Sequence, residues 1–455
     1  MNGRMYLKIN HLLKRIRFCL IAGIAVFALT GCETIDSWFS TPKPPLPGKR
    51  ISVMVGQRSI QPDARLKDKQ ILLPPPTPNA DWPQAGGYAN HAMHHVQAGD
   101  SLKPIWKEDI GDGSGSEVRL IASPVVAKGV VYTIDADSEV RAYTVKSGRR
   151  IWSNDVTPRK DNDGHMPGGI AYDNGRVFVA TGFAELIALD AASGKVIWRR
   201  NLGGPMRAAP TVRGGRVFVI TLDNKLHALS ANSGKSLWKF TGVGEVSSLL
   251  GSASPAVDAG IVVAPFSSGE LVALRVNDGQ LIWSDSLSNV RKSSTSISTL
   301  SHIRGRPVID RGRVFAVSHG GAIAAFDLRS GRRIWDKTIG SHESPWVVGD
   351  YIFMLTNNSE LVALSRDNGQ VYWVLALPRH VDNDIKKPAI IWTGPLLVSD
   401  RLIVAGSHGR AIAVSPYSGK VLGIERMPDG VTVSPVVADR VIYFLTDDAD
   451  LIAYR

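Results

Sequence analysis

One pattern returns along this chain at intervals of roughly 40 to 50 residues: Leu-x-Ala-Leu, then a Gly five positions later, then a Trp. Clear copies occupy 186–198, 226–238 and 271–283, and looser copies occupy 140–152, 323–335 and 361–373. A seventh copy, 411–423, has Gly423 where Trp is expected, and an eighth starts at Leu451 and reaches Arg455 before its Gly and Trp. Self-similarity at this period is typical of repeat architectures, and here it indicates a β-propeller.

Each repeat can be divided into four short strands. A proline often opens the unit, and a turn residue precedes an apolar run such as 217–220. Short runs of β-branched residues between turns are typical of strands that are buried on both faces. The Leu-x-Ala-Leu segment forms the third strand, a turn containing Gly follows, and the fourth strand carries the Trp. The prediction is an all-β chain with four antiparallel strands in each blade.

The recurring Trp is interpreted as a packing residue that docks between neighbouring blades. Burial of an indole at about 25 cal/mol per Å² predicts a cost of ~3–5 kcal/mol for Trp238→Ala. The seven predicted docking residues are Trp106, Trp152, Trp198, Trp238, Trp283, Trp335 and Trp373.

The truncated eighth repeat predicts how the ring closes. It lacks a fourth strand, whereas residues 102–110, with Trp106, precede every complete unit. Pairing these two ends in one sheet would close an eight-bladed ring and remove exposed strand edges. The propeller is therefore assigned to residues 81–455.

The first 31 residues have the pattern of a secretory signal peptide, with a basic start and an apolar stretch from Phe18 to Leu29. The sequence Leu29-Thr30-Gly31-Cys32 resembles the bacterial lipobox. This resemblance implies cleavage before Cys32 and acylation of Cys32, with palmitate among the chains. Glu33 at the next position implies sorting to the outer membrane. The alternative is an ordinary secretory signal with an incidental cysteine.

Residues 32–80 are assigned to a tether. The chain has only two cysteines, Cys19 within the signal and Cys32 at the anchor, so the propeller is expected to fold without disulfides. Proline is frequent between Thr41 and Ala80, which favours an extended linker. Part of this segment, such as residues 71–73, is a candidate for packing on the ring.

The formal net charge is +12, and the signal contributes five positive charges and no acid. Basic and aromatic residues do not alternate in a nucleic-acid-binding pattern, so no nucleic-acid partner is predicted. His91, His94 and His95 form the only dense histidine group. Without a companion Cys or acidic motif, they are interpreted as solvated or locally hydrogen-bonded, and no metal site is predicted.

The Gly-Lys-x-x-Trp strands resemble the propeller of the quinoprotein dehydrogenases, the PQQ-dependent enzymes. That resemblance implies a pair of adjacent cysteines and a calcium site with a catalytic Asp. The chain beyond the signal has no Cys pair, and its acidic residues are spread rather than clustered. No recognisable nucleophile turn accompanies its Ser, His and Asp residues. The prediction is a non-enzyme without a cofactor or catalytic residues, with a PQQ-dependent dehydrogenase as an alternative.

The lipobox, the tether and the eight repeats together resemble the BamB family of propeller lipoproteins. The resemblance covers residues 81–455 and is marked in Phe326-Asp327-Leu328-Arg329-Ser330-Gly331 through Trp335. It implies a non-catalytic scaffold of the BAM complex, anchored in the outer membrane and facing the periplasm. Such a scaffold binds the POTRA domains of the BamA barrel protein and assists the assembly of unfolded outer-membrane proteins. The alternative in another class is an anchored propeller that binds a different envelope ligand.

The resemblance implies partner contacts on two loops, 242–251 and 288–306. The second loop lies in the longest interval between successive tryptophans, Trp283 to Trp335, so an insertion is visible without the family. Long loops on a rigid scaffold are where binding residues concentrate. A solvated insertion without a partner is the alternative.

Transferred by position, the family's apolar contacts fall on Ser247 and Leu249, its Arg on Leu250, and its acidic pair on His302 and Arg304. Only Leu249 keeps the family's character, so the contact chemistry is expected to differ here. The predicted site is an apolar anchor flanked by basic side chains that meet carboxylates of the partner. Its residues are Leu249, Leu250, Arg291, Lys292, His302 and Arg304.

Overall fold

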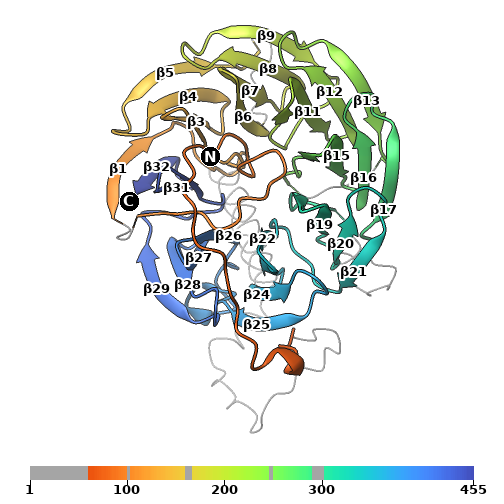
Figure 1. Ribbon diagram of the computed structural model, residues 1–455. Helices are drawn as coiled ribbons and strands as arrows, with labels where there is room; N and C mark the ends of the chain where they lie inside the picture. The colour runs from red at the N-terminus through yellow and green to blue at the C-terminus, as the bar shows by residue number, and fades with distance from the viewer. Residues whose placement is uncertain (1–59, 100–102, 159–165, 245–249, 289–301) are drawn as a thin grey trace, which may run out of the picture. The chain divides into compact units, whose positions relative to one another are not determined.

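Eight sheets of four antiparallel strands stand around a common axis and form a closed ring (Figure 1). The computed structural model describes residues 60–99, 103–158, 166–244, 250–288 and 302–455, which all lie in the unit Ile60–Arg455. The predicted eight-bladed β-propeller is therefore confirmed. The anchor residue Cys32 lies outside the described residues.

Blades 1 to 4 follow one another in the chain, each built from the innermost strand outward. Their strands are β2 (Val125–Ala127), β3 (Val130–Ile134), β4 (Glu139–Thr144) and β5 (Arg150–Asp155); β6 (Gly169–Asp173), β7 (Arg176–Ala180), β8 (Glu185–Asp190) and β9 (Val196–Asn201); β10 (Thr211–Arg213), β11 (Arg216–Thr221), β12 (Lys225–Ser230) and β13 (Ser236–Thr241); and β14 (Ala256–Asp258), β15 (Ile261–Pro265), β16 (Glu270–Arg275) and β17 (Leu281–Ser286).

Blades 5 to 8 continue in the same order, except that blade 8 takes its outer strand from the start of the ring. Their strands are β18 (Val308–Asp310), β19 (Arg313–Val317), β20 (Ile323–Asp327) and β21 (Arg333–Lys337); β22 (Trp346–Val348), β23 (Tyr351–Leu355), β24 (Glu360–Ser365) and β25 (Val371–Ala376); β26 (Trp392–Val398), β27 (Arg401–Gly406), β28 (Arg410–Val414) and β29 (Val421–Arg426); and β30 (Val436–Ala438), β31 (Val441–Leu445), β32 (Asp450–Tyr454) and β1 (Pro104–Asp109).

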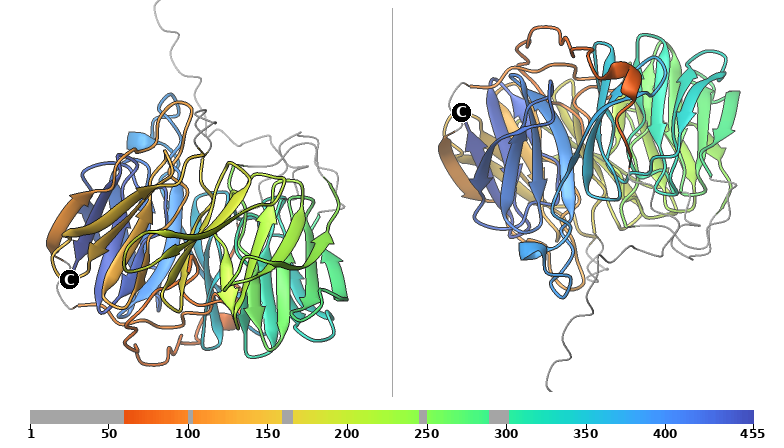
Figure 2. Two further views of the ribbon diagram at one scale, coloured as in Figure 1. Left: turned by 90° about the horizontal axis from the view of Figure 1, so that it is seen from above. Right: turned by 90° about the horizontal axis from the view of Figure 1, so that it is seen from below.

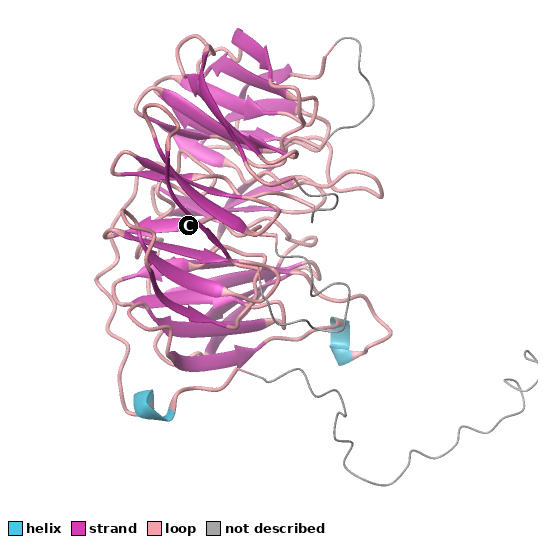
Figure 3. Cartoon of the chain, turned by 90° about the vertical axis from the view of Figure 1, so that its right-hand side faces the viewer, coloured by secondary structure: helices cyan, strands magenta, loops and turns pink. Residues whose placement is uncertain are grey.

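Helical structure in the described residues is limited to two short 3-10 turns, η1 (Ala64–Leu66) and η3 (Val381–Asn383), which lie on loops (Figure 3). No helix in the described ranges is both long enough and apolar enough to cross a membrane.

The core lies between the blades. The second and third strands of each blade are buried on both faces, as in β7 and β8, whereas the outer strands are largely exposed. Each apolar cluster draws on neighbouring blades; one joins Phe178 of blade 2 to Val217 of blade 3. Continuous apolar runs therefore mark strands covered by a blade on each side.

Each of the seven recurring tryptophans lies on the outer strand of one blade and contacts the next blade. Its Nε1 donates a hydrogen bond of 2.8–3.1 Å to a backbone carbonyl there, as from Trp152 to Ala191. The ring also lies against the turn glycine of that next blade. These glycines have φ between +66° and +72°, and a Cβ on any of them would come within 3.0 Å of the indole. The repeat glycine therefore serves both the turn and the close approach of the ring.

The junction between blades 7 and 8 differs from the other seven. Gly423 pairs with Ala413 in the register that Trp198 and Ala188 occupy in blade 2. No atom lies within 4 Å of a Cβ built on Gly423, and every residue of β29 is exposed. An apolar cavity of about 200 Å³ remains there, lined by Ile403, Ile412, Phe444 and Tyr454 among others.

The two ends of the ring meet in blade 8. Strand β1 pairs antiparallel with β32, and Lys103 and Arg455 exchange two backbone hydrogen bonds of 2.9 and 3.1 Å. The predicted closure by the first and last strands is confirmed.

Residues 79–99, called the collar here, touch every blade on one face of the ring. Examples are Val257 N donating to Ala89 O and Ile309 N donating to Asn90 O, both within innermost strands. The partners of the collar in blades 1 to 8 are, in order, Val126, Tyr172, Val212, Val257, Ile309, Trp346, Ser399 and Arg440. The collar lies on the face opposite to the loops that join one blade to the next, as Figure 2 shows from two sides.

Residues 60–80, which the sequence assigns to the tether, also contact the propeller. Ile71 is buried against Val348 and Tyr351, and Asp63 N donates to Val371 O at 2.8 Å. The compact unit begins at Ile60, so this part of the proline-rich segment packs on the ring.

Candidate functional site

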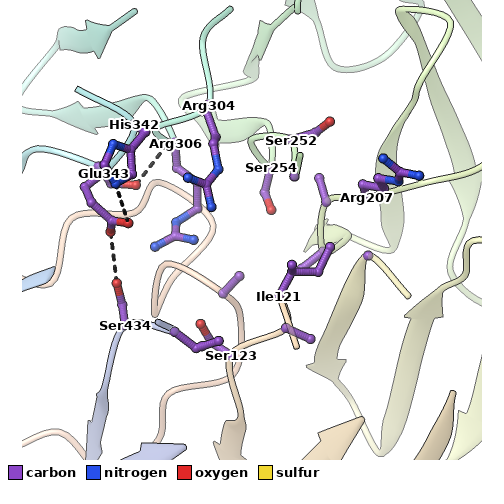
Figure 4. A pocket seen from close by; sticks show the side chains of 18 of the residues that line it. Ile121, Ser123, Arg207, Ser252, Ser254, Arg304, Arg306, His342, Glu343 and Ser434 are labelled. Atoms are coloured by element: carbon purple, nitrogen blue, oxygen red, sulfur yellow. Dashed lines mark hydrogen bonds and ion pairs between the residues drawn. The ribbon is translucent and has the colours of Figure 1, made fainter. Parts of the chain in front are cut away.

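The axis of the ring contains a small polar pocket, called the hub pocket here. It has a volume of about 80 Å³ and is lined by residues that lead into the innermost strands of all eight blades. Ala85 of the collar lies at one end. The loops between blades reach the other end, and Figure 4 shows this pocket from close by.

A sequence pattern places side chains in the hub pocket. Seven blades carry a proline just before or within their innermost strand, and the residue before that proline lines the hub pocket in every one of these blades except blade 7. Because the residue before proline is held extended, its position is well defined. Six of these residues are small: Ser123, Ala209, Ser254, Ser344, Gly394 and Ser434. The seventh, in blade 5, is Arg306.

The electrostatics of the hub pocket are dominated by cations. Arg304 and Arg306 enter it from the segment before β18, and Arg207 lines it from blade 3. Burial lowers the pKa of the Arg306 guanidinium. Glu343 is the one acidic residue among the described residues that line the pocket.

Two described residues of the predicted contact site, Leu250 and Arg304, lie on neighbouring loops. These loops lead to the end of the hub pocket opposite Ala85, called the mouth of the hub here. Leu250 is 40% exposed and lies on the loop that leads into β14, and a Cβ on adjacent Gly251 would lie 3.2 Å from Arg304 Nε. The structure thus brings the ends of loops 242–251 and 288–306 together. Leu249, Arg291 and Lys292 lie outside the described residues.

His302 does not present its ring at the surface. It is only 2% exposed, and burial lowers its pKa to about 4. Its assignment as a partner-contact residue stays a prediction.

The histidine group of the sequence is divided among separate partners. His91 Nδ1 lies 2.8 Å from Pro307 O, whereas His95 contacts Pro74 O and accepts from Asp400 N. His94 is 46% exposed and lies 3.6 Å from Asp310. Within the described ranges, no three His, Cys, Asp or Glu side chains are grouped as metal ligands. The side chains of His91 and His94 thus contact blade 5, and that of His95 contacts blade 7.

Sequence reasoning did not identify Arg306 or the collar. The sequence does distinguish Arg306, because the other blades with this proline have a small residue immediately before it. No sequence pattern marks the collar, because its contacts are mostly backbone hydrogen bonds, which do not depend on the identity of the side chain.

A family model described as "Outer membrane protein assembly factor BamB" matches residues 96–167 and 136–375. Proteins with that name from Salmonella typhimurium and Escherichia coli K12 are 31% and 32% identical to this chain. The matches cover 77% and 73% of this chain and 88% and 84% of those proteins.

Solved structures show the same fold. BamB from Moraxella catarrhalis superposes with a TM-score of 0.66 at 19% identity, over 78% of this chain and 99% of that one. A quinohemoprotein alcohol dehydrogenase from Comamonas testosteroni has a TM-score of 0.62 at 16% identity, over 82% of this chain and 80% of that one. Identities this low establish the propeller fold alone. The family model and the curated relatives go further, and together they establish that the chain belongs to the BamB family.

Proposed function

We propose that this protein is a non-catalytic scaffold of outer-membrane protein assembly, anchored through Cys32 and facing the periplasm. The observation that carries the proposal is the family match over most of the ring, residues 96–375. The relatives are named as an assembly factor, which describes a partner in assembly rather than a catalyst.

The proposed partner is the set of POTRA domains of BamA, bound at the mouth of the hub. Leu249 and Leu250 supply the apolar anchor, and Arg291, Lys292 and Arg304 supply positive charge around it. The exposure of Leu250 and the closeness of the adjacent Gly251 to Arg304 support this arrangement. An apolar centre with a charged rim separates binding energy from steering and specificity.

The test is retention of the purified chain on immobilised POTRA domains. The double variant Leu249→Ser with Arg304→Glu should reduce retention at least tenfold, which corresponds to about 1.4 kcal/mol. The matched control is Leu422→Ser with Arg426→Glu, which changes one exposed Leu and one exposed Arg on β29. Equal retention of the site variant and the control would reject the proposed contact surface. Melting curves of both variants verify that each is folded.

A further inference from the structure

The hub pocket contains two guanidinium groups that point into it and form no ion pair with a described acidic residue. Figure 4 shows those of Arg304 and Arg306 directed toward the centre, whereas that of Arg207 points away from them. Neither Arg304 nor Arg306 forms an ion pair within 4 Å in the part of the chain that the structure describes. Two unpaired cations in a confined space repel each other and favour an anion between them.

Glu343, the acid that lines the pocket, is engaged elsewhere. Its Oε2 accepts hydrogen bonds from Ser434 Oγ at 3.1 Å, Thr393 Oγ1 at 3.3 Å and Gly394 N at 3.4 Å. These donors belong to blades 7 and 8, so the carboxylate ties those blades together. Its charge acts on Arg306 through space, but Glu343 forms no ion pair within 4 Å with either described arginine of blade 5.

Arg306 also has an unsatisfied buried donor. Its Nε is buried and has no hydrogen-bond acceptor among the described residues. A buried, charged donor without a partner destabilises a fold, and such groups concentrate at functional sites. Arg306 is moreover the one large residue at a position where the other proline-bearing blades have Ser, Ala or Gly. A large charged residue at a position that otherwise holds a small one destabilises the fold, and such exceptions are typical of functional sites.

We propose that the hub pocket binds a small oxyanion, either inorganic phosphate or a small carboxylate, between Arg304 and Arg306. Guanidinium forks match the oxygens of both groups. Ser254 and Ser123 line the same pocket and offer hydroxyl donors. The volume of about 80 Å³ accommodates one compact anion rather than a larger ligand. This inference goes beyond the proposed scaffold role and does not rest on it, although Arg304 takes part in both.

The experiment is thermal unfolding at constant ionic strength, with sodium chloride replaced stepwise by sodium phosphate in one series and by sodium acetate in another. Binding to the folded state alone raises the melting temperature in a saturable way, by about 1–3 °C at tenfold excess over Kd. Arg306→Gln should abolish this rise. Arg426→Gln is the matched control and should keep it, because Arg426 is exposed on β29 and does not line the hub pocket.

The two series identify the anion: a saturable rise in phosphate alone assigns the site to phosphate, and a rise in acetate alone assigns it to carboxylates. If Arg306→Gln does not fold, Arg304→Gln carries the test and should weaken binding at least tenfold. The proposal is overturned if neither anion raises the wild-type melting temperature, or if the variants respond as the wild type does. Neither result bears on retention by POTRA domains, so the two proposals fail independently.

Discussion

Trp152 of blade 1 lies so close to Gly194 of blade 2 that a Cβ on the glycine would come within 2.5 Å of the indole Cε3. The same pair recurs at seven of the eight junctions between blades. At each of these junctions the indole packs against a turn glycine, which has no side chain. The indole N–H also donates a hydrogen bond to a nearby backbone carbonyl, as from Trp152 to Ala191.

The first prediction separates the contact of Gly194 from its backbone conformation. Gly175 has φ +76° and nothing within 4 Å of a Cβ, whereas Gly194 has φ +72° and the indole against it. Gly175→Ala should cost about 1–2 kcal/mol from the left-handed conformation alone. Gly194→Ala should cost a further ~1–3 kcal/mol from overpacking. Urea unfolding of both variants measures the difference, and equal costs would contradict the packing role of the glycine.

The second prediction concerns the indole itself. Trp198 is 7% exposed and packs against Phe178 with ring centroids 5.9 Å apart. Trp198→Ala should lower the free energy of unfolding by about 3–5 kcal/mol through the cavity it leaves, and Trp238→Ala should behave similarly. Calorimetry measures the effect, and an unchanged midpoint would refute the docking role.

The third prediction restores the missing contact. Gly423 has open space where a side chain would begin, beside the apolar cavity between blades 7 and 8. Gly423→Trp should therefore stabilise the protein by ~1–3 kcal/mol, as expected for partial burial of a large aromatic ring. Gly423→Ala, which cannot fill the cavity, is the control. A melting temperature that falls for the Trp variant would show that Phe444 and Tyr454 already close this junction.

The fourth prediction tests where the ring begins. Ile71 is 4% exposed and packs on blade 6, whereas neighbouring Leu72 is 74% exposed. Ile71→Ala should destabilise the propeller by about 2–4 kcal/mol, and Leu72→Ala should have little effect. Equal melting temperatures for the two variants would show that residues 60–80 do not stabilise the propeller and belong to the tether.

The fifth prediction is a dependence of stability on pH. Burial chiefly, with a contribution from the Arg306 charge, lowers the pKa of His91 from 6.5 to about 3. Below pH 6.5 the imidazole of His91 is protonated in the unfolded chain but stays neutral in the folded chain. The contribution of His91 to the free energy of unfolding is therefore complete above pH 6.5 and is lost as the pH falls toward 3. The loss is about 1.4 kcal/mol per pH unit.

The measurement compares urea midpoints of wild type and His91→Gln at pH 7 and pH 5. The wild type should lose more stability than the variant, by roughly 2 kcal/mol. Between pH 7 and pH 8, where the ring is neutral in both states, the two proteins should change in parallel. Identical losses at pH 5 would mean that His91 is accessible to protons in the folded state.

The blade count could be predicted because each repeat must bury the same face against a neighbour, which fixes apolar and Gly positions at one period. Closure followed from counting outer strands, with Trp106 standing ahead of the first complete unit. The collar could not be predicted, since backbone hydrogen bonds such as Ala89 to Val257 leave no periodic trace. At the hub mouth, sequence placed Arg304 near Leu250 only through the family resemblance. The burial of His302 depended on tertiary covering that a loop sequence does not encode.

The pairing of β1 with β32 also makes blade 8 depend on two segments that are distant in the sequence. Blades 1 to 7 are each built from one continuous stretch of chain, whereas blade 8 combines the first strand of the propeller with three strands that follow all the others. While β1 and β32 are apart, each of them has an unpaired edge that can pair with a strand of another molecule. A partly folded ring is therefore open at two edges, and aggregation by strand addition is favoured until these two strands meet.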